Sequence, residues 1–397
     1  MSYDIIIIGA GLVGLATAYQ AKLKDPDSKI LILEKEKDVS LHQSGHNSGV
    51  IHSGIYYKPG SLKAKNCIEG YHSVINFAEK YGIRYDLCGK IIVATSQEEL
   101  PLLDNIYKRG TENGLQDLKY LSREEFREIE PHCEGVRAIK VPQTGIIDYP
   151  GVAKKIKELF EDLGGEVKFN NEVKDIINKG PEIIVKTNVS EFKTKKMVSC
   201  AGLYSDKITK MTNEKNDVII IPFRGEYYKI KDEKKHLVKH LIYPVPDPNF
   251  PFLGVHFTRM IDGNIEAGPN AVLAFKKEGY RFFDFNFEET MQTLTWPGFR
   301  KIVAKYGKTG MGEVHRSLSK AAFTKALQKL LPEIQEEDLV TGGAGVRAQA
   351  CNRNGVLIDD FDIVKNGNII HVRNAPSPAA TSCLSIGRKI SELILEN

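Results

Sequence analysis

The apolar and polar positions of the first 34 residues follow the order of a nucleotide-binding βαβ unit. Four β-prone apolar residues, Ile5 to Ile8, lead directly into the glycine-rich segment Gly9-Ala10-Gly11-Leu12-Val13-Gly14. Residues 15–21 have the composition of a helix, and a second apolar run at 30–33 ends at Glu34. This order predicts a strand, a tight turn, a helix and a second strand that ends in an acid, which is typical of dinucleotide-binding α/β folds.

Each glycine of this turn has a separate physical purpose. Gly9 allows the tight turn, Gly11 lets the backbone approach a pyrophosphate, and Gly14 lets the helix pack closely on the strand. The unpaired N–H groups and the positive dipole end of the helix favour phosphate there. We therefore expect Gly9 to Gly14, together with Glu34 and Lys35, to bind a dinucleotide, and the acid argues against a 2′-phosphate. The alternative is a turn whose glycines serve packing alone.

The remaining pattern mixes helices with many short strands. Helical periodicity is present at 61–81, 151–163, 285–332 and after residue 381. Short β-prone runs separated by turn residues lie at 166–169, 173–177, 182–187, 197–200, 218–221, 224–230, 241–245, 253–258, 264–267, 356–358 and 369–372. We therefore predict an α/β fold with a Rossmann-like domain assembled from three segments, 1–85, 146–215 and 335–397. A β-rich substrate domain of residues 86–145 and 216–334 would be inserted between them.

Composition narrows the class of protein without indicating a reaction. The 397 residues are 42% hydrophobic and 27% charged, with a net charge of +4, which describes a globular protein of two domains and disfavours nucleic acid as a partner. The six cysteines include no Cys-x-x-Cys pair, so we expect a reducing compartment, no metal centre and no disulfide framework. No apolar run reaches 18 residues and no basic segment precedes the apolar start, so we expect a cytoplasmic protein without a membrane span or signal peptide.

A glycine-rich polar segment follows Glu34 after a short loop. It has the sequence Ser44-Gly45-His46-Asn47-Ser48-Gly49-Val50-Ile51-His52-Ser53-Gly54-Ile55-Tyr56-Tyr57. Small residues suit a backbone that lies along a planar ligand and donates N–H groups to it. We therefore expect cofactor contacts from Ser44, Gly45, Asn47, Ser48, Gly49 and Val50, with a mobile surface loop as the alternative. The predicted strand end at Ala201-Gly202 is a second place where backbone can approach a nucleotide.

Together with the opening glycine motif, this segment carries a family resemblance. The two motifs resemble those of the FAD-dependent oxidoreductases that include glycine oxidase and D-amino-acid oxidase. Within that family, residues 42–57, 251–257, 344–350 and 374–381 are similar to the L-2-hydroxyglutarate dehydrogenases (oxidases). The resemblance implies FAD as cofactor and oxidation of L-2-hydroxyglutarate to 2-oxoglutarate by hydride transfer from C2 to the flavin N5, with electrons passed to a quinone or O2. The targeting segment of mitochondrial members is not seen, which implies a bacterial form.

The chemistry implied by this resemblance assigns roles to particular side chains. A 2-hydroxy acid gives up its hydroxyl proton as it loses hydride, so we expect either His52 or His256 to be the base and the other its hydrogen-bond partner. Arginine binds carboxylates with paired N–H bonds, which makes Arg347 the first choice for a substrate that has two carboxylates. The weaker substrate-binding candidates, whose ordinary roles are solvated strand ends and packing, are Arg259, Arg224, Tyr57 and Tyr243.

Further cofactor contacts are expected at three other places. Val173 begins a predicted strand, and Gly345 and Arg347 lie in one of the runs that resemble the family. By the same resemblance, the helix after Ser377-Pro378-Ala379-Ala380-Thr381 points its N-terminus at the flavin, where its dipole would stabilise negative charge. An ordinary helix start is the alternative, because proline, serine and threonine are common there.

Aromatic and cationic residues are mixed over 275–285 and 296–301. The mixture suits a peripheral contact with the inner face of the cytoplasmic membrane, as delivery of electrons to a quinone would need. The alternative is that the aromatics are buried under a cationic face.

Three other functions stay open on this fold: an amine-oxidising flavoprotein of the amino-acid oxidase type, a glycerol-phosphate dehydrogenase, and a non-catalytic FAD-binding sensor. The two histidines favour an alcohol over an amine, because a free amine reacts without a strong base.

Overall fold

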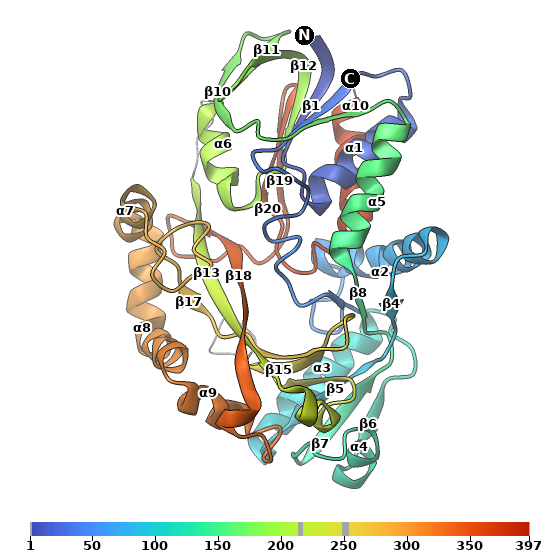
Figure 1. Ribbon diagram of the computed structural model, residues 1–397, viewed down its shortest axis with the longest axis vertical. Helices are drawn as coiled ribbons and strands as arrows, with labels where there is room; N and C mark the ends of the chain where they lie inside the picture. The colour runs from blue at the N-terminus through green and yellow to red at the C-terminus, as the bar shows by residue number, and fades with distance from the viewer. Residues whose placement is uncertain (1, 213–216, 248–253, 397) are drawn as a thin grey trace.

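The computed structural model describes residues 2–212, 217–247 and 254–396. The molecule is elongated, with both chain termini at one end (Figure 1). The described strands form an eight-stranded sheet, a nine-stranded sheet and a small sheet of β3 (Val50–Ile51), β8 (Gly145–Ile147) and β4 (Tyr85–Asp86). The small sheet contacts both halves, because Ile51 packs in the core of the first and Val50 packs against strands of the second.

The eight-stranded sheet carries the predicted nucleotide-binding unit. β1 lies parallel between β2 and β12, β9 continues the sheet beyond β2, and β20 pairs with the end of β12. Its strands are β1 (Ser2–Ile8), β2 (Ile30–Leu33), β9 (Glu166–Lys168), β10 (Val173–Asn178), β11 (Ile183–Thr187), β12 (Glu191–Ser199), β19 (Asp362–Asn366) and β20 (Ile369–Asn374).

Helices from distant parts of the chain share one core with this sheet. They are α1 (Leu12–Lys24), α2 (Leu62–Tyr81), α5 (Tyr149–Asp162) and α10 (Cys383–Leu395). The last helix packs directly on the first, since a Cβ atom on Gly387 would lie 2.6 Å from the backbone of Ala16. On the way to the second half, the chain forms a 3₁₀ turn at Gly202–Tyr204 and α6 (Ser205–Met211).

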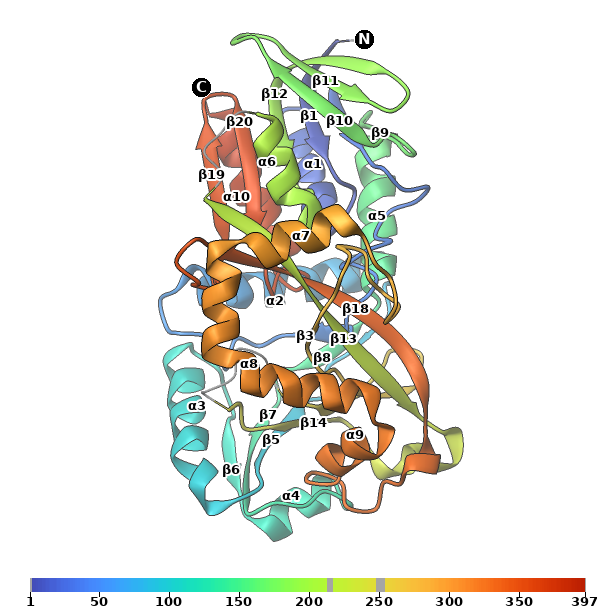
Figure 2. The same cartoon turned by 90° about the vertical axis from the view of Figure 1, so that its left-hand side faces the viewer.

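The nine-stranded sheet builds the second half. Its strand order is β17-β13-β16-β15-β14-β5-β7-β6, with β18 paired to β13. The strands are β5 (Lys90–Ala94), β6 (Lys119–Leu121), β7 (Arg137–Val141), β13 (Val218–Ile230), β14 (Leu241–Pro244), β15 (His256–Arg259), β16 (Ile265–Gly268), β17 (Val272–Leu273) and β18 (Leu339–Asn352). Around it lie α3 (Leu100–Glu112), α4 (Arg123–Ile129), α7 (Phe287–Thr295), α8 (Pro297–Leu318), α9 (Lys320–Leu327) and the 3₁₀ turns 97–99, 232–237 and 336–338. Figure 2 shows α7 to α9 in front of this half.

β13 and β18 form the longest ladder of the molecule. They pair antiparallel from Val218 opposite Asn352 to Ile230 opposite Leu339, and they run from the nucleotide-binding half into the other half (Figure 1). One end of the ladder therefore lies near the predicted cofactor site and the other end within the second sheet.

Most predicted elements are present, with three differences. The expected strands 218–221 and 224–230 form one continuous strand, which accommodates Pro222 because pairing to β17 begins only at Phe223. The segment 335–397, predicted as part of the Rossmann-like domain alone, contributes to both large sheets, because its glycine-rich run at 342–345 is part of β18. The strand expected at 356–358 is only a single bridge between Cys351 and Leu357.

Two further expectations concern the family motif at 251–257 and the membrane. Residues 251–253, which belong to a motif of the family resemblance, lie outside the described residues. Among the helices that the structure describes, none combines the length and apolarity that a bilayer crossing needs.

Candidate active site

The turn between β1 and α1 explains its three glycines in steric terms. Gly9 has φ +104°, a backbone conformation that side chains disfavour. A Cβ on Gly14 would lie 2.0 Å from the Gly9 carbonyl oxygen, and a Cβ on Gly11 would lie 3.1 Å from Ser44 Oγ. Helix α1 begins without a side-chain cap, although the Leu12 N–H donates to Ser44 Oγ at 3.0 Å. The uncapped helix end is therefore a cradle suited to phosphate.

Glu34 ends β2 beside this turn and is buried. Its carboxylate accepts hydrogen bonds from the Ala10 N–H at 2.7 Å and the Glu36 N–H at 2.9 Å. Because a carboxylate can accept about four bonds, it keeps capacity for ribose hydroxyls.

Lys35, the other residue expected at the cofactor, instead joins the two halves of the molecule. Its amine pairs with Glu36 and with Glu278 from the loop before α7. His42 Nε2 lies 3.0 Å from Glu36 Oε1, and acceptor atoms of Glu36, His42 and Glu278 gather within 4.8 Å of one another. The ammonium of Lys35 contacts both carboxylates.

The glycine-rich segment after Glu34 lies flat against its surroundings. A Cβ on Gly45 would lie 2.3 Å from the Ser40 carbonyl oxygen, and a Cβ on Gly345 of β18 would lie 2.5 Å from the His46 carbonyl oxygen. Asn47 holds the loop from inside, because its side chain donates to Ser44 O at 2.9 Å and accepts from the Gly49 N–H at 2.9 Å. Ser48 follows, and Val50 opens β3. The segment is therefore packed against Ser40 and β18, with Gly45 and His46 exposed at its surface.

The other expected cofactor residues fall into two groups. Ala201 lies beside the glycine turn, and Gly202 has φ +53° with Gln43 next to it. Val173 packs in a hydrophobic core against the eight-stranded sheet. Residues 377–381, including Pro378, Ala379 and Ala380, lead into α10, which begins without a side-chain cap. The buried Ser382 Oγ has no hydrogen-bond partner in the described part of the chain. Two uncapped helix ends and a glycine cradle thus fit a dinucleotide with a flavin.

The hydroxyl of Thr381 forms its hydrogen bonds with other groups of the protein. Its fully buried hydroxyl accepts from the His52 N–H at 3.1 Å and lies 2.8 Å from the Tyr149 hydroxyl, which donates to Val50 O at 3.0 Å. The hydroxyl thereby ties the start of α10 to the segment that carries His52.

The structure brings His52 and His256 into one site. Burial, followed by the charges of Lys90, His256 and Lys63, lowers the pKa of His52 to about 3. Burial also lowers the pKa of His256 to about 4, with smaller contributions from the charges of Arg347 and Lys90. Both imidazoles are therefore neutral at neutral pH and can accept a proton.

The two rings are held differently. His52 Nε2 lies 3.2 Å from Ser377 Oγ. His256 Nδ1 lies 2.9 Å from the Gly254 carbonyl oxygen, and its ring centroid lies 4.0 Å from that of Tyr243, with the two ring planes inclined by 36°. A carbonyl can only accept, so the proton of His256 is on Nδ1 and its Nε2 carries the lone pair. Within the described part of the chain, that Nε2 has no hydrogen-bond partner.

Sequence reasoning missed Lys90. It begins β5, is 3% exposed, and lies beside the two histidines, whose pKa values its charge lowers. Burial lowers the pKa of Lys90 itself to about 7. A lysine at the start of an apolar run resembles an ordinary strand boundary, so its position became visible only with the pairing of β5 and β14.

The expected substrate-binding residues divide into two sets. Tyr57 contacts Ser377, and the Tyr243 ring contacts that of His256 at a tilt. The half-buried Arg347 donates to Asn270 O at 3.2 Å and interacts electrostatically with His256. In contrast, Arg259 pairs with Asp86, and Arg224 pairs with Glu226 at 3.0 Å and donates to Arg281 O.

Comparison with known proteins agrees with this geometry. A family model described as FAD dependent oxidoreductase matches residues 4–393. The solved L-α-glycerophosphate oxidase of Mycoplasma pneumoniae with FAD bound has the same fold, with a TM-score of 0.82 at 24% identity, covering 100% of this chain and 96% of that one. The chain belongs to the family of FAD-dependent oxidoreductases.

Curated relatives narrow the comparison further. The chain is 57% identical over 397 residues to the L-2-hydroxyglutarate dehydrogenase of Indibacter alkaliphilus, covering all of both chains. It is 47% identical over 408 residues to the mitochondrial L-2-hydroxyglutarate dehydrogenase of Homo sapiens, covering 98% of this chain and 88% of the relative.

Proposed function

We propose that this protein oxidises L-2-hydroxyglutarate to 2-oxoglutarate with bound FAD and passes the electrons to a quinone or O2. The observation that carries the proposal is the meeting of two neutral imidazoles, the buried Lys90 amine and the Arg347 guanidinium in one site. The names of the most similar curated relatives support the substrate. FAD, when bound, supplies the acceptor for the hydride that leaves the substrate carbon.

We infer that His256 is the base. Its Nδ1–H donates to Gly254 O, which leaves the Nε2 lone pair free to take the hydroxyl proton of the substrate. Contact with the Tyr243 ring restricts the orientation of the imidazole. His52, bonded to Ser377, would then hold the same oxygen as a hydrogen-bond partner.

Arg347 is suited to the carboxylate next to the reacting carbon. It lies two residues beyond Gly345, which contacts the cofactor segment, and its charge acts on His256. A guanidinium with two parallel N–H donors orients a carboxylate, and this would present the neighbouring C2–OH to the histidines.

The decisive experiment is an anaerobic titration of the FAD-loaded protein, followed by the loss of oxidised-flavin absorbance. We expect bleaching by L-2-hydroxyglutarate and none by the D-enantiomer, glycine or glycerol phosphate. Bleaching by glycine would indicate an amine oxidase, and bleaching by glycerol phosphate a glycerol-phosphate dehydrogenase. A yellow protein that none of these reduces would indicate a sensor.

In the same assay, His256→Gln should slow flavin reduction about 10²–10⁴-fold, the usual contribution of a general base. His52→Gln should slow flavin reduction less than His256→Gln does.

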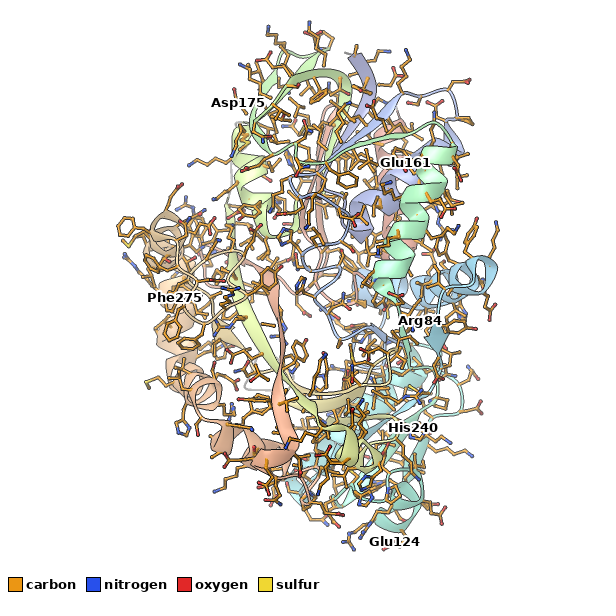
Figure 3. The ribbon with its side chains drawn as sticks, in the orientation of Figure 1. Arg84, Glu124, Glu161, Asp175, His240 and Phe275 are labelled. Atoms are coloured by element: carbon orange, nitrogen blue, oxygen red, sulfur yellow. The ribbon has the colours of Figure 1, made fainter. Side chains whose placement is uncertain are left out.

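We also propose that the surface around α7 and α8 contacts a lipid bilayer. Exposed aromatics gather there, with Phe283 at 91%, Phe285 at 61% and Phe287 at 71% exposure (Phe275, on the same loop, is labelled in Figure 3). Arg281 and Lys301 are exposed beside them, as suits anionic lipid headgroups. Trp296 and Phe299 from the same stretch pack inward instead.

Sedimentation with anionic phospholipid vesicles tests this contact. The double variant Phe283→Asp/Phe285→Asp should stay in the supernatant, while the wild type sediments. Val189→Asp is the matched control, because Val189 is 62% exposed on a turn of the other half. Equal sedimentation of the wild type and the double variant would contradict the membrane contact.

A further inference from the structure

Lys90 presents an unusual combination of burial and missing partners. Its ammonium lies 4.5 Å from the centroid of the Tyr56 ring and 5.0 Å from that of Tyr243. Among the described residues, no carboxylate or other hydrogen-bond acceptor pairs with it, although it is 3% exposed. A buried ammonium without an acceptor is destabilising, and proteins keep one where a ligand supplies the missing charge.

Tyr56 offers a second unpartnered group at the same place. Its hydroxyl is buried and has no hydrogen-bond partner among the residues that the structure describes. The backbone that carries it is held firmly, because Asn113 donates to Gly54 O at 3.0 Å and to Tyr57 O at 2.9 Å, and Arg109 donates to Tyr56 O. A fixed hydroxyl and a fixed ammonium together can donate to both oxygens of one carboxylate.

The strand order places Lys90 and Arg347 on either side of the strand that carries His256. Lys90 of β5 pairs with Leu241 of β14, and β14 is followed in the sheet by β15, which begins at His256. Beyond β15 the sheet continues through β16 and β13 to β18, which carries Arg347. The charges of both Lys90 and Arg347 act on His256.

We propose that Lys90 and Tyr56 bind the carboxylate of the substrate that is remote from the reacting carbon, while Arg347 binds the near one. The assignment rests on the proposed function and deepens it, because it makes Lys90 the residue that selects dicarboxylates. A 2-hydroxy acid with one carboxylate would leave the ammonium and the hydroxyl unpaired, which is how a polar site rejects an analogue.

Binding of glutarate, a dicarboxylate that cannot be oxidised at C2, tests this without turnover. The FAD-loaded wild type should bind it with a change in flavin absorbance, and Lys90→Met should bind it about 10- to 100-fold more weakly, as expected for lost hydrogen bonds to a charged group. Tyr56→Phe should show a smaller loss, and Lys90→Arg should recover part of the affinity. Butyrate, with one carboxylate, should bind equally to the wild type and all three variants.

Lys63→Met is the matched control. Lys63 is also buried and also lies near His52, but its ammonium is paired with Asp359 at 2.7 Å. Its removal should leave the ratio of glutarate to butyrate affinity unchanged. Retained flavin content and circular dichroism identify correctly folded variants, and Tyr56→Phe and Lys90→Arg test the subsite if Lys90→Met does not fold.

Turnover then separates the two carboxylates. With Lys90→Met, kcat/KM compared above the pKa of the base should fall far more for L-2-hydroxyglutarate than for L-2-hydroxybutyrate. An equal loss of kcat/KM for both acids would overturn the assignment and place Lys90 at the near carboxylate. In the binding experiment, glutarate affinity that is unchanged in Lys90→Met would overturn the subsite itself. If L-2-hydroxyglutarate fails to reduce the wild-type flavin while glutarate binding still depends on Lys90, the subsite stands and the proposed reaction fails.

Discussion

Thr381→Val separates the structural and cofactor roles of the segment before α10. Valine keeps the shape of the side chain and removes the hydroxyl, which leaves the His52 N–H without its acceptor at 3.1 Å. Tyr149 keeps its bond to Val50 O at 3.0 Å, so one buried donor is orphaned. Such a group costs about 1–3 kcal/mol. With about 2.1 cal/mol/K of unfolding entropy per residue over 397 residues, the melting midpoint falls by roughly 1–4 °C.

The assay compares Thr381→Val with Tyr149→Phe by calorimetry of the FAD-loaded protein and by the rate of flavin reduction. Tyr149→Phe removes the larger hydrogen-bonding group, yet the Thr381 hydroxyl can then turn to Val50 O at 3.4 Å while still accepting from His52. We therefore expect a smaller loss of stability and no change in rate for Tyr149→Phe, and a slower rate for Thr381→Val, because the His52 segment loosens. An equal or greater effect of Tyr149→Phe on both quantities would refute this reasoning.

Three further predictions concern the cofactor turn, the histidines and the arginines. Gly14→Ala should weaken FAD retention about tenfold or more, because it forces a Cβ against Gly9 O. The ratio of flavin to protein absorbance measures this retention. The control Gly343→Ala should retain FAD, because its Cβ would meet no described atom within 4 Å. The base must be unprotonated, so flavin reduction should rise with pH through the pKa of the base. Lys90→Met should move that rise to higher pH, since the Lys90 charge lowers the pKa of His52 and His256; an unmoved or lowered midpoint would contradict this. Arg259→Met should leave KM for the acid unchanged, because Asp86 already binds this guanidinium, whereas Arg347→Met should raise it.

The parts of the fold that local sequence determines were predictable. The glycine turn, Glu34 and the helices at 62–81 and 149–162 follow from spacing and periodicity within a single segment. The continuity of β13 through Pro222 was not predictable, because it depends on where a distant strand begins to pair. The glycine run 342–345 likewise resembles a turn and becomes strand only through its long ladder with β13.

The site divides in the same way. His52 could be recognised from its place in the glycine-rich segment, whereas Lys90 could not, because its orientation depends on the pairing of β5 with β14, more than 140 residues apart. The sequence ranked Arg259 and Arg224 below Arg347 as candidates, but only tertiary contacts revealed that carboxylates already bind the first two. The choice between His52 and His256 as base needed a tautomer, which a backbone carbonyl determines.

Residues 44–57 contact the cofactor cradle at one end and carry His52 and Tyr56 at the other. A single continuous segment therefore contacts both ligands, and a shift of its backbone at one end is transmitted to the other end. Linkage then requires reciprocity: the factor by which FAD tightens the hold on the acid is the factor by which the acid tightens the hold on FAD. A cell that is short of flavin but rich in substrate would keep more of this protein loaded than one that is short of both.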